Sequence, residues 1–314
     1  MKLALAGDTM LGRGVAERLR STPPRDLVSP EVVEAAHEAD AFLLNLECCI
    51  SERGEPWPAP GKPFFFRAPP RATELLDHLG VGCVTLANNH ALDFGYDALL
   101  DTLENLQTAG IATVGAGADL DAARALVALE LNGFRLAVLG ATDHPNDFAA
   151  QADHPGVALL ELDWLTDAIA AAKTNADAVL VTPHWGPNMR AEPTEAVLTA
   201  SKALEHAGAT LVAGHSAHVF QGVARRTLYD LGDFLDDYRV DPLLRNDLGL
   251  LFLVELSSEG PRRLEALPLE LDYCYTRVAS GDDAAWIARR LRQLCGAVGT
   301  EVREEGRRLA IELG

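Results

Sequence analysis

Six side chains that could bind divalent metal ions stand at or directly after the ends of short apolar segments. In chain order they are Asp8, Glu47, Asn89, His184, His215 and His218. The apolar segments that lead to them cover residues 3–7, 41–46, 81–87, 178–182 and 210–213. Carboxylate, amide and imidazole donors suit Mn²⁺, Fe²⁺, Zn²⁺ or Co²⁺ better than Ca²⁺ or a structural zinc. The pattern therefore predicts a catalytic type of metal site.

Six donors are too many for one tetrahedral ion and about right for two ions that share a carboxylate. Two ions about 3.5–4 Å apart can hold the attacking and leaving oxygens of an in-line displacement, and they lower the pKa of a water molecule. His90, next to Asn89, is placed to protonate the leaving oxygen as a general acid. This chemistry predicts a metal-dependent hydrolase that acts on a phosphoester or a comparable anionic bond.

Each of these residues also has a simpler structural interpretation when it is taken alone. Asp8 could cap a helix, Asn89 could belong to a turn, and His184 beside Trp185 could be an ordinary core histidine. The coincidence at five strand ends favours the metal site over these alternatives. Three further residues follow another apolar segment and are open candidates for the same cleft: Asp143, His144 and Asp147.

The elements that must position these side chains alternate along the chain. Short apolar runs predict strands, and segments 95–110, 162–176 and 194–208 have the apolar spacing of helices. Asn132-Gly133 between two strand-like halves predicts a hairpin, and the part after residue 218 is rich in strands. We therefore expect an α/β protein with a mixed sheet. The strand ends of its parallel part would open onto one crevice.

The organisation of the chain indicates one domain over residues 1–314, because strands and helices continue to alternate across the proline-rich stretch 54–63. The formal net charge of -19 disfavours binding to nucleic acid or to an anionic membrane. An anionic substrate, small or polymeric, would then need the metal ions to attract it. The apolar N-terminal run is too short for a signal peptide, no run reaches membrane-spanning length, and the five cysteines form no CxxC pair. These features predict a cytoplasmic protein with reduced thiols.

Several longer motifs resemble the CapA family of poly-γ-glutamate capsule biosynthesis, which is itself similar to the calcineurin-like metallophosphoesterases. The motifs, in order, are GDTMLGRGV, NLECCIS, KPFFFRAPP, the stretch around LANNHALDFG, PHWG, GHSAHVFQG and YDLGDFL. The resemblance extends from about residue 3 to residue 240 and more loosely to 272, so residues 273–314 form a weakly matched C-terminal extension.

The resemblance implies a four-layer α/β/β/α sandwich with mixed sheets and two metal ions at the strand ends. It makes Asp8 the first acidic ligand and places Glu47 where the phosphoesterases have a bridging Asp. It makes Asn89 a ligand and His90 the general acid. The histidine ligands that it implies are His184, His215 and His218.

The chain departs from the phosphoesterase pattern at four places. Met10 stands where the Asp-x-His start has its histidine, and Glu47 is one methylene longer than Asp. Two residues instead of one separate His215 from His218, and Asp233 stands where the CapA family commonly has Asn. Candidate neighbours of the substrate are Arg13, Asn45, Arg67 and Asp233, of which the two arginines could hold an anion.

Two other functions stay open at this point. The family name suggests assembly, export or cleavage of poly-γ-glutamate, which would be chemistry on amide bonds. The missing ligand at Met10 suggests a metal-binding scaffold without catalysis. The number and identity of the metal ions, the substrate and the oligomeric state are not specified by the residues.

Overall fold

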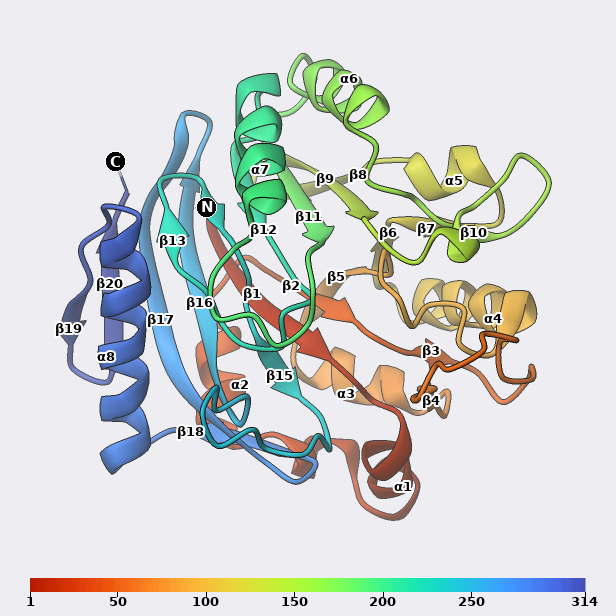
Figure 1. Ribbon diagram of the computed structural model, residues 1–314, viewed down its shortest axis with the longest axis horizontal. Coiled ribbons are helices and arrows are strands. Elements are labelled where there is room, and N and C mark those ends of the chain that lie inside the picture. Colours follow the sequence, from red (N-terminus) through yellow and green to blue (C-terminus); the bar gives the residue numbers. More distant parts are fainter. Residues whose placement is uncertain (314) are drawn as a thin grey trace.

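The computed structural model describes residues 1–313 and contains two large β-sheets with helices on their outer faces (Figure 1). The larger sheet has ten strands. Its main path, in spatial order, is β19 (Arg303–Glu305), β20 (Arg308–Glu312), β17 (Gly260–Asp272), β16 (Leu248–Ser257), β1 (Lys2–Thr9), β2 (Ala41–Leu46), β5 (Val81–Thr85) and β6 (Ala112–Val114). Two further strands pair off this path, β15 (Asp233–Leu235) with β1 and β18 (Tyr275–Val278) with β17.

The second sheet has six strands. Their spatial order is β13 (Val223–Ala224), β14 (Thr227–Leu228), β12 (Leu211–Ala213), β11 (Ala178–His184), β9 (Phe134–Thr142) and β8 (Val127–Leu131). Two small ribbons complete the strands: β3 (Cys49–Ile50) with β4 (Arg67–Ala68), and β7 (Ala116–Gly117) with β10 (Gly156–Val157). The hairpin predicted at Asn132-Gly133 is confirmed, because β8 and β9 pair antiparallel on either side of it.

The sequence of β1 explains why sheets and helices form separate layers. Alternate side chains of a strand point to opposite faces. Leu3 and Leu5 pack between the two sheets against β9 and β11, whereas Ala4 and Ala6 face the first group of helices. That group comprises α1 (Arg13–Ser21), α2 (Pro30–Ala36), α3 (Ala72–His78) and α4 (Gly95–Thr108), with a 3₁₀ turn at Pro24–Leu27.

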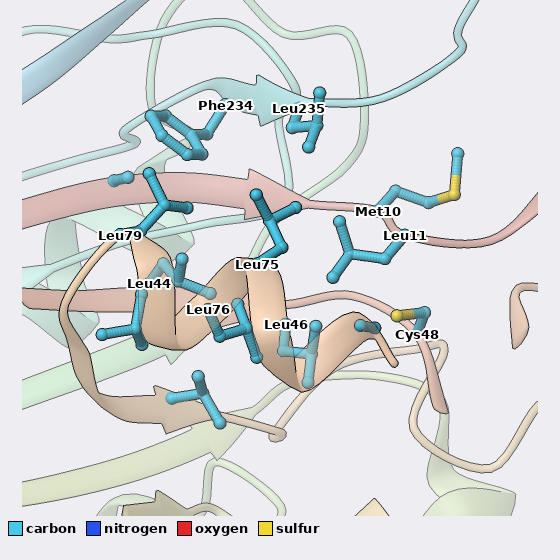
Figure 2. Packing of buried hydrophobic residues seen from close by; sticks show 14 of the residues in the cluster. Met10, Leu11, Leu44, Leu46, Cys48, Leu75, Leu76, Leu79, Phe234 and Leu235 are labelled. Carbon is cyan, nitrogen blue, oxygen red and sulfur yellow. The ribbon is translucent and has the colours of Figure 1, made fainter. Parts of the chain in front are cut away.

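The outer face of the six-stranded sheet is covered by α6 (Leu162–Ala172) and α7 (Glu195–Ala207). The remaining helical elements are α5 (Leu120–Arg124), the 3₁₀ turn Asn146–Phe148 and α8 (Gly281–Ala297). The apolar side of α8 packs near β13, β16 and β17. The order helix, sheet, sheet, helix is the four-layer sandwich that the resemblance implies. Figure 2 shows the first helical interface, where Leu75 and Leu76 of α3, and Leu79 directly after it, pack with residues of the strands.

One sequence-based expectation about the sheets was wrong. We expected the metal-binding residues at the ends of strands of a single sheet, but β1, β2 and β5 belong to the larger sheet and β11 and β12 to the smaller one. An apolar run indicates that a strand is buried, but it does not indicate which sheet contains that strand. The two sheets pack face to face, and their parallel strand ends still meet at the same side. The bridge between His184 and His215 lies at this side.

The end of β1 has an irregular register that positions Asp8. Ala6 pairs with Leu44 of β2, but Asp8 already pairs with Asn45, so the chain bulges at Gly7. On its other side Asp8 pairs with Asp233 of β15. Bulges of this kind redirect side chains and are common beside active sites.

Gly7 is required by the close approach of β15 at this bulge. A Cβ atom on Gly7 would lie 1.7 Å from the carbonyl oxygen of Gly232. The same oxygen accepts a hydrogen bond of 2.8 Å from the backbone N–H of Asp8. A side chain at position 7 would therefore push β15 away from the metal-binding end of β1.

Gly7→Ala should lower the free energy of unfolding by about 1–3 kcal/mol, the usual cost of overpacking a core. The control is Gly82→Ala in β5, where an added Cβ would meet no other atom of the described chain within 4 Å. Urea denaturation of both variants measures the difference. Equal effects at the two positions would contradict the steric argument.

None of the helices within residues 1–313 combines the length and the apolar character needed to cross a membrane. All five cysteines are buried as free thiols.

Candidate metal centre

Asp8 is the common element of two groups of potential metal ligands. Asp8, Glu47 and His184 offer ligand atoms that all lie within 4.8 Å of one another, and so do Asp8, His218 and Asp233. The resemblance gives the bridging position to Glu47, but in this arrangement the residue shared by the two groups is Asp8. All five side chains are buried. The candidate ligands therefore gather in two groups that meet at Asp8.

His215, the remaining candidate histidine, also contacts the carboxylate of Asp8. His215 Nδ1 lies 3.4 Å from Asp8 Oδ1, and His218 Nδ1 lies 3.3 Å from Asp8 Oδ2. Nε2 of His215 is 3.0 Å from the hydroxyl of Thr182, which leaves Nδ1 for the centre. Glu47 lies on the other side, with Oε2 at 3.9 Å from His218 Nδ1. Residues that are widely separated in the sequence thus converge here.

Several buried polar atoms at this centre have no hydrogen-bond partner within residues 1–313. They are both carboxylate oxygens of Glu47, His184 Nε2, His215 Nδ1 and Asp233 Oδ2. Asn89 Oδ1, next to His90 in the sequence, also has no partner among the described residues, and the role of Asn89 as a ligand stays a prediction. Each unsatisfied buried polar group costs about 1–3 kcal/mol, and more if it is charged. Oxygen and imidazole atoms of this kind are the donors that divalent ions of the Mn, Fe, Zn and Co type prefer. The residues present therefore fit a metal centre.

The electrostatics of the centre follow from burial and crowding of carboxylates. Burial and then the negative charge of Asp8 raise the pKa of Glu47 well above its ordinary value. Burial also tends to raise the pKa of Asp8, but the adjacent imidazole of His215 and the charges of His218 and His184 outweigh it and lower that pKa. Burial keeps the pKa of His184 well below its ordinary value. His184 is therefore neutral, the form in which imidazole binds metal ions.

The loop that carries His215 and His218 has a strained backbone. Ser216 and His218 have φ values of 109° and 58°, in the left-handed region that favours glycine. Such conformations cost about 1–3 kcal/mol each and persist where the surrounding structure enforces them. Here the backbone N–H of Ser216 donates to Asp8 Oδ2 at 3.2 Å. The strain and this bond together turn His218 toward the centre.

His90 is held by two residues that the sequence analysis missed. Its Nδ1 lies 2.6 Å from Oδ2 of Asp93, and Asp93 Oδ1 lies 2.7 Å from Nζ of Lys62. Asp93 is fully buried, and its Oδ2 also accepts the backbone N–H of Phe66 at 2.6 Å. Because Asp93 occupies Nδ1, Nε2 of His90 is left on the side of Glu47, 3.9 Å from Oε1. The motif NNHALD contained the signal, as Asp93 lies three residues after His90.

Two candidate substrate neighbours prove to be part of the centre instead. Asn45 is fully buried and donates from Nδ2 to Asp8 Oδ1 at 2.7 Å, within 3.3 Å of His184 Nδ1. Asp233 is buried, and its Oδ1 lies 2.8 Å from Nδ1 of His218. Strand pairing turns both side chains inward, toward the candidate ligands. Their role as substrate ligands stays a prediction.

The two candidate arginines have different surroundings. Arg13 lines a cleft of about 660 Å³ that also borders His90 and His218. Arg67 is not among the described residues that line this cleft. Its guanidinium donates to the carbonyl oxygens of Arg53 and Gly54. One of the two arginines thus borders the cleft beside His90 and His218, and the other does not.

The open candidates at 143–147 lie at the edge of the centre. The ring of His144 is 5.4 Å from that of His184, and Asp143 accepts the backbone N–H of Gly186 at 2.8 Å. Asp147 accepts the indole N–H of Trp57 at 2.8 Å. Trp185, which follows His184, is buried and donates to the carbonyl oxygen of Tyr229. Of the three side chains at 143–147, that of His144 packs against the ring of a candidate ligand.

The four layers match the sandwich that the resemblance implies, and the candidate metal ligands gather where strands of both sheets end. A hypothetical protein from Thermus thermophilus has a similar fold, with a TM-score of 0.52 and 16% identity over 86% of this chain and 99% of that one. A 5'-nucleotidase precursor from the same organism is less similar, with a TM-score of 0.46 and 14% identity over 90% of this chain and 55% of that one.

The family model described as "Bacterial capsule synthesis protein PGA_cap" matches residues 2–238, and the chain belongs to this family. A "Probable polyglutamine synthesis accessory protein" of Mycobacterium tuberculosis (strain CDC 1551 / Oshkosh) is 32% identical over 84% of this chain and 74% of its own length. "PGA biosynthesis protein CapA" of Bacillus subtilis (strain 168) is 27% identical over 86% of this chain and 72% of its own. The resemblance to the CapA family is thus confirmed.

Proposed function

We propose that this protein is a metal-dependent hydrolase that cleaves a phosphoester with two divalent ions. The observation that carries the proposal is the set of buried donor atoms without partners around Asp8 and Glu47. A core without ions would leave these atoms unsatisfied at considerable cost. When bound, the ions supply Lewis-acid polarisation of a phosphoryl oxygen and bring the pKa of a water molecule toward neutrality.

The chain's own residues hold and orient the reacting groups. Asn45 fixes the carboxylate of Asp8 through its 2.7 Å hydrogen bond, and Asp233 fixes the ring of His218 at 2.8 Å. Partners of this kind set the orientation of metal ligands. His90 borders the cleft, and we assign it the transfer of a proton from Nε2 to the leaving oxygen. Asp93 keeps its ring in the orientation that this transfer requires.

The names of the relatives favour a second candidate, the synthesis or processing of poly-γ-glutamate through chemistry on amide bonds. The net charge of -19 counts against it, because a polyglutamate chain is repelled everywhere except at the metal ions. In either case we propose a cytoplasmic protein whose partner is an anionic substrate rather than nucleic acid or a membrane.

The test uses one purified sample that is stripped with a chelator, reloaded with Mn²⁺, Zn²⁺, Fe²⁺ or Co²⁺, and analysed for metal content. We expect two ions per chain and metal-dependent hydrolysis within a panel of phosphomonoesters and phosphodiesters. The same sample is assayed on γ-glutamyl polymers. Cleavage of the polymers alone would favour the second candidate, and bound metal without any hydrolysis would favour a non-catalytic scaffold.

A further inference from the structure

We propose that the cleft beside the metal centre is a leaving-group subsite for a flat, uncharged aromatic or heteroaromatic group. This inference rests on the proposed function and adds the class of substrate to it. The cleft has a volume of about 660 Å³, within the range of pockets that hold small organic ligands. His90 and His218 border it, so a phosphoryl group at the metal ions would project its leaving group into this space.

One wall of the cleft is a row of rings that runs from the centre to the surface. The ring of Phe66 lies 4.1 Å from that of His90, and the ring of Phe64 is nearly parallel to Phe66 at 6.3 Å. Tyr238 closes the row, 5.3 Å from the ring of His218. Phe64 is 52% exposed and therefore offers an open apolar surface. Aromatic side chains placed in this way favour another ring by stacking or by edge contact.

The charges of the cleft argue against an anionic leaving group. Arg13 lies about 5 Å from the ring centres of Phe64 and Phe66, but its guanidinium is already paired with Asp237. Nε of Arg13 lies 3.0 Å from Asp237 Oδ1, and the backbone N–H of Gly14 donates to Oδ2 of the same carboxylate at 3.0 Å. Arg239 and Asp241 add one charge of each sign to the lining. The formal charges of these four residues cancel, which favours a neutral group over a polyanion.

The test separates binding from turnover by using phosphonates, which cannot be hydrolysed. Calorimetry measures the affinity of the metal-loaded protein for benzylphosphonate, methylphosphonate and phosphonoacetate. We expect benzylphosphonate to bind about five- to tenfold more tightly than methylphosphonate, the range of an aromatic contact. Phe64→Ala should remove this preference. Tyr96→Ala, which truncates an exposed aromatic residue outside the cleft lining, should keep it.

Equal affinities for the benzyl and methyl compounds, tightest binding of the anionic phosphonoacetate, or no binding at all would overturn the subsite. A preference that survives Phe64→Ala would also overturn it. Failure of the hydrolase proposal gives a different result: Phe64-dependent binding of benzylphosphonate without turnover of benzyl phosphate. If benzyl and ethyl phosphate are both hydrolysed with equal kcat/KM, the hydrolase stands and the subsite does not.

Discussion

Glu47→Gln is expected to weaken the response of this protein to metal ions without destabilising the metal-free form. Saturating Mn²⁺ should raise the Tm of the parent protein by about 5 °C, since a ligand at a hundred times its Kd stabilises by about 2.7 kcal/mol. Because Glu47 belongs to only one of the two groups of potential ligands, the variant should show a smaller rise, and its hydrolysis of phosphoesters should fall at least about a hundredfold. Thermal denaturation with and without the metal measures the first effect.

The expected stability of the metal-free variant follows from the environment of Glu47. Its two oxygens accept no hydrogen bond from residues 1–313, and burial together with Asp8 raises its pKa well above the ordinary value. When folding raises the pKa of a carboxyl group, the protein loses stability as the pH rises above the pKa that this group has in the unfolded chain. In chelator at pH 7, the neutral amide should therefore be at least as stable as the parent side chain.

The matched control is Glu104→Gln, which changes an exposed carboxylate on α4. It should leave the metal response and the activity unaltered. If Glu47→Gln keeps the full metal-induced rise in Tm, Glu47 is not a ligand and the arrangement around Asp8 has to be reconsidered.

His90→Ala is expected to keep the metal ions and to slow hydrolysis by about 10²–10⁴-fold, the range of general acid catalysis. The effect should depend on the substrate. An alkyl phosphate needs a proton on its leaving oxygen, whereas p-nitrophenyl phosphate has a good leaving group and should lose much less rate. Steady-state kinetics on both substrates, with metal analysis of the same sample, measure the difference.

His206→Ala is the control for this substitution, because His206 lies on α7, outside the cleft lining. If the rate of hydrolysis falls equally for the alkyl and the nitrophenyl substrate, His90 has a structural role and does not donate the proton. If the His90→Ala variant loses the metal ions, His90 is a metal ligand and not the general acid.

The sequence by itself determined most of the elements and the identity of the donors. The apolar run 178–182 was predicted as a strand and lies within β11, which covers Ala178–His184. The residues at the strand ends were recognised because polar side chains are poor continuations of a buried strand, and that information is local. The CapA motifs added the expected four layers.

Only the tertiary structure decided which residues meet. Asp233 faces Asp8 through the pairing of β15 with β1, and Lys62 reaches Asp93 across a loop. Arg13 pairs with the carboxylate of Asp237, which lies 224 residues away in the sequence. The periodicity of a segment reports its own buried face, but the partner of that face depends on sheet order and register. For this reason the chemistry of the centre could be predicted from the sequence, while its shared carboxylate and its adjoining cleft could not.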